Sequence, residues 1–138
     1  MRRLAPFLGI ALLLAGCGGG KTVSPTAKTV IGSVPTSTQA SVPAGDAKAG
    51  ATLFKSSGCG GCHKFTPAGT NKTIGPDLDK LAQYTQEANQ GSEAEFTFES
   101  IKNPASYVQP GYQNVMPNFG QTLSDKQIAD IVAYLTKS

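Results

Sequence analysis

Hydrophobic residues recur at helical spacing near the C-terminal end of the chain. After Ser124, the apolar residues Ile128, Ile131, Val132 and Leu135 lie at positions i, i+3, i+4 and i+7. Residues at this spacing share one face of a helix, and such a face is normally buried. The pattern therefore predicts a C-terminal helix with one side in a hydrophobic core.

Two capping signals mark where helices begin. Ser124 with Gln127, and Ser92 with Glu95, match the arrangement in which the cap residue and the third helical residue satisfy each other's backbone donors. After Ser92 the apolar spacing continues as far as the stop signal Asn103-Pro104. A second helix is therefore expected between Ser92 and that stop signal.

Two further helices are expected earlier in the chain, over residues 46–56 and 77–83. Gly50 lies inside the first of them, where glycine is unfavourable, which indicates that another backbone packs closely against it. The alternation Phe96-Thr97-Phe98 also fits a strand, so the helix after Ser92 has an alternative. No other segment suggests a sheet, and the predicted fold class is all-α.

The N-terminal segment has the pattern of a secretory signal. Arg2 and Arg3 precede the apolar run 4–15, which is too short to span a bilayer as a helix, so residues 1–16 are read as the signal. The sequence Leu-Ala-Gly before Cys17 resembles the lipobox of bacterial lipoproteins, which implies cleavage before Cys17 and its acylation. A short membrane anchor, or an ordinary signal with an incidental Cys, is the alternative.

The resemblance to a lipobox implies an extracytoplasmic protein, lipid-anchored to a bacterial membrane and facing the periplasm or the cell exterior. Residues 17–45 hold the lipidated Cys and a segment rich in Gly, Ser, Thr and Pro, with no aromatic residue and only Lys21 and Lys28 charged. Such a composition cannot form a core and predicts a flexible linker. The folded domain is then expected over residues 46–138.

Composition excludes several classes of protein. The 138 residues include 12 Lys plus Arg and 9 Asp plus Glu, and the basic residues form no cluster, so nucleic-acid binding is not expected. One His and three Cys cannot build a zinc site of four cysteines, or of two cysteines and two histidines, within one chain.

One short motif does point to chemistry. Cys59-Gly60-Gly61-Cys62-His63 matches the C-x-x-C-H signature for covalent attachment of c-type haem. Two thiols three positions apart can reach the two vinyl groups of one porphyrin, while the next side chain ligates the iron. His63 is the only His, so it is the proximal ligand if haem is bound, and one such motif means one haem.

Three other interpretations of the motif remain open at this stage. A thioredoxin-like redox pair also uses C-x-x-C, but it normally follows a strand in a sheet-containing fold. A structural zinc site would need a fourth ligand besides Cys59, Cys62 and His63. A disulfide between Cys59 and Cys62 is compatible with an oxidising compartment, although it leaves the adjacent His63 unexplained.

The second axial ligand decides between an electron carrier and a reactive centre. Met1 leaves with the signal, so Met116 is the only thioether of the mature chain, and it lies in a Pro-bordered loop before the last helix. A lone Met is often core filler, but this loop could cross the haem face opposite His63. A His/Met pair fills both axial positions and favours electron transfer. The predicted metal ligands are therefore His63 and Met116.

Taken together, these motifs resemble a small mono-haem cytochrome c. The residues that carry the resemblance are Gly50, Phe54, Cys59, Cys62, His63, Gly75-Pro76-Asp77-Leu78, Met116-Pro117 and Tyr134. The resemblance implies a small cytochrome c fold with three to five helices around one covalently bound haem c. It also implies that the Pro76 carbonyl orients His63, as part of the cofactor site.

Packing contacts follow from the same resemblance. The first and last helices are expected to cross with Gly50 and Phe54 against Ile131, Tyr134 and Leu135. Tyr107 and Tyr112 either bond the haem propionates or pack the loop that carries Met116.

The run from Asn103 to Ser124 is similar to the haem c domain of bacterial cytochrome oxidase subunit II, without its copper-binding domain or transmembrane hairpin. The implied function is electron transfer in a respiratory or photosynthetic chain, with no enzymatic activity and no small-molecule substrate. Redox partner proteins, such as a terminal oxidase or a quinol-oxidising complex, are expected. The alternatives are a haem-based sensor or peroxidase-like enzyme with an open or displaceable sixth position, and a fixed subunit of a larger complex.

Overall fold

The structure is a computed structural model that describes residues 41–137. The signal expected at residues 1–16, the acylation of Cys17 and the linker as far as residue 40 lie outside the described residues, so they remain predictions. Within the described range, no helix is long and apolar enough to span a bilayer.

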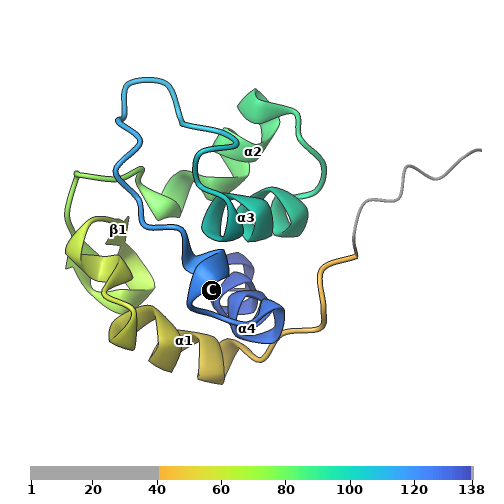
Figure 1. Ribbon diagram of the computed structural model, residues 1–138. Coiled ribbons are helices and arrows are strands. Elements are labelled where there is room, and N and C mark those ends of the chain that lie inside the picture. The colour runs from red at the N-terminus through yellow and green to blue at the C-terminus, as the bar shows by residue number, and fades with distance from the viewer. Residues whose placement is uncertain (1–40, 138) are drawn as a thin grey trace, which may run out of the picture. The chain divides into compact units, whose positions relative to one another are not determined.

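Helices make up most of the described part of the chain (Figure 1). Its elements, in chain order, are α1 (Ala47–Ser56), η1 (Cys59–Gly61), β1 (Lys64–Phe65), η2 (Thr66–Ala68), β2 (Thr70–Asn71), η3 (Leu78–Lys80), α2 (Leu81–Ala88), α3 (Glu93–Lys102), η4 (Phe119–Gln121) and α4 (Asp125–Thr136). The predicted all-α class with three to five helices is confirmed. Residues 103–118, called the strap below, contain no helix or strand and connect α3 to η4.

Capping residues begin two helices where the sequence predicted. Ser92 and Ser124 each accept a hydrogen bond from the backbone of the third helical residue, while Glu95 and Gln127 accept one from the cap backbone in return. Residues 96–98 lie inside α3, so the helical interpretation of this segment is correct and the strand alternative is wrong. A reciprocal cap provides hydrogen-bond partners for two backbone N–H groups at the start of the helix. This stabilises the helix more than the short alternation at residues 96–98 favours a strand.

The helix expected at residues 77–83 is longer than the sequence suggested. A 3-10 turn, η3, leads into α2, which continues to Ala88 and ends at Asn89 in the left-handed conformation, with φ of 50°. The N–H of Asn89 donates to the Thr85 carbonyl and closes the last turn. Asn tolerates this conformation better than most residues, so it can end a helix in place of Gly.

Helices α1 and α4 cross in direct contact (Figure 1). A Cβ at Gly50 would lie 1.9 Å from the Asp130 carbonyl oxygen, so only Gly fits at this crossing. The ring of Phe54 packs edge-on against Tyr134, with 5.7 Å between ring centroids. The expected crossing is present, with Gly50 meeting Asp130 and Tyr134 most closely.

One short pair of strands corrects the expectation that no sheet is present. Strands β1 and β2 are antiparallel, with Lys64 opposite Asn71 and Phe65 opposite Thr70. Gly69, with φ of 69°, closes the turn between them. Two residues per strand are too few to show an alternating pattern, so the sequence carried no signal for this pair.

Contacts with the core begin before α1. Val42 packs against the hydrophobic core, and a Cβ at Gly45 would lie 2.0 Å from the Ala129 carbonyl oxygen. The N–H of Asp46 donates to Oδ1 of Asp130 at 2.6 Å. The end of the segment expected as linker is therefore in contact with α4.

Candidate functional site

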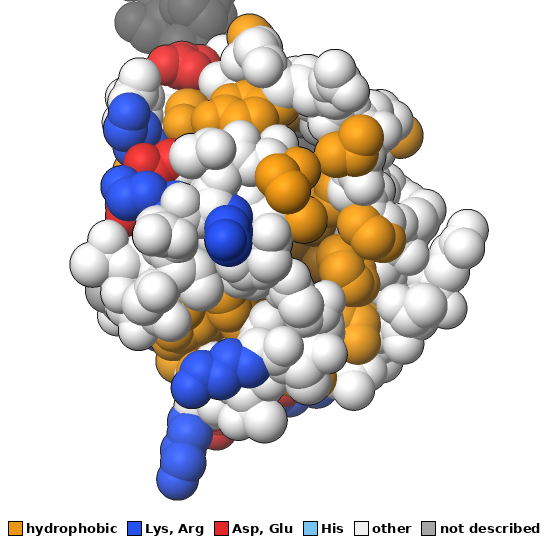
Figure 2. All heavy atoms as spheres, turned by 90° about the vertical axis from the view of Figure 1, so that its left-hand side faces the viewer, with side chains coloured by type: hydrophobic (Ala, Val, Ile, Leu, Met, Phe, Trp, Pro, Cys, Tyr) orange, Lys and Arg blue, Asp and Glu red, His pale blue; other side chains and the backbone are white. Residues whose placement is uncertain are grey.

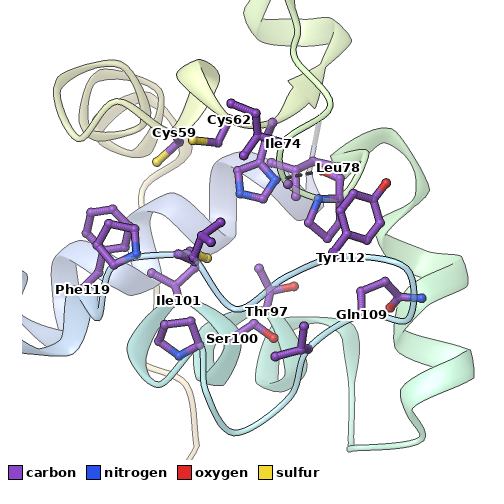
Figure 3. A pocket seen from close by; sticks show the side chains of 18 of the residues that line it. Cys59, Cys62, Ile74, Leu78, Thr97, Ser100, Ile101, Gln109, Tyr112 and Phe119 are labelled. Carbon is purple, nitrogen blue, oxygen red and sulfur yellow. Dashed lines mark hydrogen bonds between the residues drawn. The ribbon is translucent and has the colours of Figure 1, made fainter.

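A cavity with mostly apolar walls lies between the loops that follow α1, helices α2 and α3, and the strap (Figure 3). Every residue predicted for the cofactor site of the folded domain lines this cavity: Cys59, Cys62, His63, Pro76 and Met116. Figure 3 shows Cys59 and Phe119 towards one end, and Gln109 and Tyr112 towards the other. Segments that are far apart in the sequence thus contribute to one site.

The turn that carries both thiols is fixed by its own backbone. Gly58 follows α1 in the left-handed conformation, with φ of 75°, which glycine adopts without strain. The Cys59 carbonyl then accepts hydrogen bonds from the N–H groups of Cys62 and His63, at 3.2 and 3.0 Å. This tight turn brings two thiols and one imidazole to the same cavity, and neither thiol is in a disulfide.

The other interpretations of the C-x-x-C-H motif do not fit this geometry. Helix α1, not a strand, precedes Cys59, and burial raises the pKa of the Cys59 thiol, whereas redox-active cysteines usually have a lowered pKa. Among residues 41–137, no three His, Cys, Asp or Glu side chains are grouped closely enough to hold a metal ion. The free thiols likewise argue against a structural disulfide.

The imidazole of His63 is buried and oriented. Its Nδ1 lies 2.8 Å from the Pro76 carbonyl oxygen, which can only accept, so Nδ1 carries the proton and Nε2 keeps a free lone pair. Burial lowers the pKa of His63, while the bond to Pro76 opposes that shift. A Cβ at Gly75 would lie 2.5 Å from Cε1 of His63, so the glycine lets the backbone support the ring. These features suit a neutral imidazole that ligates iron.

Two further contacts join the same pair of segments. The Lys64 ammonium bonds Asp77 at 2.9 Å, and the Thr66 N–H and hydroxyl donate to the Asp79 carboxylate at 2.8 and 2.7 Å. The Thr66 donors, and then Lys64, hold the pKa of Asp79 below its usual value. The chain that follows the thiols is thereby held along the segment that contains Pro76.

Met116 lines the cavity from the strap and is half-buried. Its neighbour Val115 is 58% exposed, as is Ile74 on the loop before Pro76, and both also line the cavity. Figure 2 shows hydrophobic side chains gathered on one face of the domain. The cavity therefore has apolar side chains at its exposed edge as well as inside.

Sequence reasoning missed the polar residues that fasten the strap. Gln109 is buried and donates to Glu87 of α2, and the Tyr107 hydroxyl donates to Gln109. Tyr107 also packs edge-on against Phe96, at 5.3 Å between ring centroids. Tyr107 thus packs the strap, which is one of its two expected roles. An irregular segment has no periodicity, so nothing in the sequence marked Gln109 as buried.

Paired thiols, an oriented imidazole and an apolar cavity define a protein with a covalently attached haem. The match to the Cytochrome c family spans residues 47–138, and the chain belongs to this family. It is 34% identical over 96 residues to cytochrome c6 of Picosynechococcus sp., covering 67% of this chain and 73% of that protein. It is 32% identical over 112 residues to cytochrome c of Guizotia abyssinica, covering 72% of this chain and 96% of that protein.

Cytochrome c of Stellaria longipes is 35% identical over 108 residues, covering 68% of this chain and 94% of that protein. The protein is therefore a mono-haem electron carrier of the cytochrome c family. Its cofactor is one haem c, attached through Cys59 and Cys62. The residues present fit this group, because two free thiols and a neutral imidazole share one mostly apolar cavity.

Proposed function

We propose that the protein is an extracytoplasmic electron carrier, tethered to a bacterial membrane through Cys17, with His63 and Met116 as the axial ligands of its haem iron. The observation that carries the proposal is that His63 and Met116 line the same cavity from two separate segments. Nitrogen and thioether ligation is the combination that suits electron transfer at a raised reduction potential.

The roles of the chain's own residues follow from this arrangement. The haem supplies a one-electron couple between ferric and ferrous iron. His63 stays neutral and oriented through Pro76, and the apolar walls exclude water from the site. With haem bound, Met116 would supply the second ligand of the iron and so leave no position for oxygen or peroxide. With both positions filled by side chains, the site favours electron transfer over substrate chemistry.

Redox proteins are the proposed partners, such as a terminal oxidase or a quinol-oxidising complex. Ile74 and Val115, each 58% exposed at the cavity, offer an apolar contact surface for brief docking. A flexible, lipid-anchored linker would keep the domain near such partners at the membrane surface. The similarity of residues 103–124 to the haem c domain of oxidase subunit II supports a place in a respiratory chain.

Carbon monoxide tests the proposed ligation, because it binds ferrous haem only where a position is free. The reduced full-length protein should reject carbon monoxide. Met116→Leu keeps the apolar volume but removes the thioether, so it should bind carbon monoxide readily. Val115→Leu, at the exposed neighbouring position, is the matched control and should reject the gas. Carbon monoxide binding by the unsubstituted protein would instead favour a sensor or a peroxidase-like enzyme.

Fractionation of cells tests the tether. The unsubstituted protein should sediment with membranes and be released only by detergent. Cys17→Ser should appear in the soluble fraction with an unchanged haem spectrum, because the match to the Cytochrome c family covers residues 47–138 and does not include Cys17. Retention of Cys17→Ser in the membrane fraction would contradict the proposed lipid anchor.

A further inference from the structure

Residues 103–118 of the strap have no helix or strand, so side-chain contacts with neighbouring helices help to hold this segment in place. Within it, Gln109 is only 9% exposed, which is unusual for an amide side chain in a loop. A buried polar group must be hydrogen-bonded to be tolerated. The partners of Gln109 therefore identify where the strap is held.

Gln109 is joined to α2. Its Nε2 donates to Oε2 of Glu87 at 2.8 Å, and its Oε1 accepts from the Tyr107 hydroxyl at 3.3 Å. The other carboxylate oxygen of Glu87 accepts from Nε2 of Gln83, also at 2.8 Å, one helical turn earlier. Because both oxygens of Glu87 have partners, its carboxylate is fixed in an orientation that faces the strap.

A second contact joins the strap to α2 three residues later. Tyr112 lies beside Tyr84, and burial and then this neighbouring hydroxyl raise the pKa of Tyr84. Tyr84 and Glu87 are at positions i and i+3 of α2, so they lie on one face of the helix. This face of α2 therefore contacts both Gln109 and Tyr112.

Gln109 and Tyr112 are the first and last residues of one tight turn. The Tyr112 N–H donates to the Gln109 carbonyl at 3.1 Å, and Gly111 between them has φ of 90°. Figure 3 shows Gln109 and Tyr112 close together at one end of the cavity. Met116 follows four residues after Tyr112, so the position of this turn limits where Met116 can lie.

We propose that Tyr84 and Glu87, the α2 latch, hold the strap closed over the cavity, and that Gln109 and Tyr112 are positioning residues for Met116. The proposal rests on the proposed ligation of iron by Met116. Closing the latch keeps the thioether within reach of the iron. Opening it lets the strap move away and frees the sixth position for another ligand.

Exogenous imidazole measures how often the latch is open. Imidazole binds ferric iron only when Met116 has left, so its apparent affinity rises with the fraction of open molecules. A substitution that breaks the latch should therefore tighten imidazole binding and weaken the far-red charge-transfer band of sulfur bound to ferric iron. A residue with a purely structural role would lower the thermal midpoint without changing imidazole affinity.

The decisive variants exchange the two partners of the hydrogen bond. Gln109→Glu places one carboxylate against Glu87, so the bond is replaced by repulsion, and imidazole affinity should rise at least about tenfold. The double variant Glu87→Gln with Gln109→Glu restores a carboxylate and an amide in exchanged positions, and should return the affinity to within about threefold of the original. Gln86→Glu adds the same charge to an exposed position of α2 and should change nothing.

Each outcome decides the proposal. The latch is supported if Gln109→Glu binds imidazole more tightly than the unsubstituted protein and the double variant returns to the original affinity. Unchanged imidazole affinity in Gln109→Glu, or failure of the double variant to recover, overturns it. Should Gln109→Glu fail to mature with haem, Gln109→Asn gives the same test without a new charge, since its shorter side chain cannot reach Glu87.

The same spectra separate this proposal from the proposed ligation. Were Met116 not a ligand, the unsubstituted ferric protein would lack the far-red band, and Met116→Leu would leave imidazole affinity unchanged. With the band present in the unsubstituted protein and lost in Met116→Leu, a failure of the Gln109→Glu test concerns the latch alone.

Discussion

The two walls of the cavity are held by different kinds of contact. On the His63 side, residues 62–66 run beside residues 75–79, and the contacts between them keep a constant separation of 13 positions. Three of these contacts use a backbone group on one or both sides. On the strap side, the connections of residues 107–112 to α2 and α3 run from side chain to side chain.

Because the contacts differ in kind, the positions of His63 and Met116 depend on different parts of the chain. The register between residues 62–66 and 75–79 fixes the orientation of His63 through neighbouring backbone. Met116 instead depends on partners that lie far from it along the chain. Changes on the His63 side should therefore appear mainly as lost stability, and changes on the strap should appear mainly as ligand exchange.

The largest effect on stability is expected at Gly75, where the backbone packs directly against the ring of His63. In Gly75→Ala the new Cβ would lie 2.5 Å from Cε1 of His63, so the ring or the loop must move. We expect a loss of about 1–3 kcal/mol in the free energy of unfolding, measured by urea denaturation of the full chain. Gly61→Ala is the matched control, because no atom lies within 4 Å of its Cβ. Equal losses in the two variants would contradict a tightly packed His63 wall.

A smaller effect is expected from the aromatic contact of the strap. Tyr107→Leu removes the edge-on pair with Phe96, which should cost about 1 kcal/mol and also tighten imidazole binding to ferric iron. Tyr107→Phe keeps the ring pair and loses only the 3.3 Å hydrogen bond to Gln109, so its imidazole affinity should lie nearer that of the unsubstituted protein. The comparison is wrong if Tyr107→Leu changes stability while imidazole affinity stays constant.

The smallest effect is expected at Asp79, on the outer side of the His63 wall. Its pKa is lowered in the folded protein by Thr66 and then Lys64, so its contribution to stability is present above the unfolded-state pKa and disappears as pH falls through the folded-state pKa. Asp79→Asn should therefore lower stability at pH 7 by less than about 1 kcal/mol and flatten the loss of stability in acid. Urea denaturation across the acid range measures this, and identical acid slopes in both proteins would refute the assignment.

Local signals explain which parts of the fold the sequence could predict. The reciprocal caps at Ser92 and Ser124 depend on residues three positions apart, and both helices begin there. Gly50 inside a helix indicated a close backbone contact, and Asp130 supplies it. The thiols and imidazole of the site are also adjacent in the chain, so one motif was enough to find them.

Contacts between distant segments explain what could not be predicted. Glu87 and Gln109 are 22 positions apart, and neither has a spacing or neighbour that marks it as a partner of the other. The strand pair at Phe65 and Thr70 is too short to alternate. Such features arise only once packing has brought the segments together, so they require the structure.

The ferric absorption spectrum of the full-length protein tests the central claim most directly. Ligation of iron by His63 and Met116 predicts a weak far-red band from sulfur-to-iron charge transfer in the unsubstituted protein. It also predicts that the band disappears in Met116→Leu while the haem remains attached through Cys59 and Cys62. A ferric protein that carries haem but lacks the band, or a band that persists in Met116→Leu, would contradict the account.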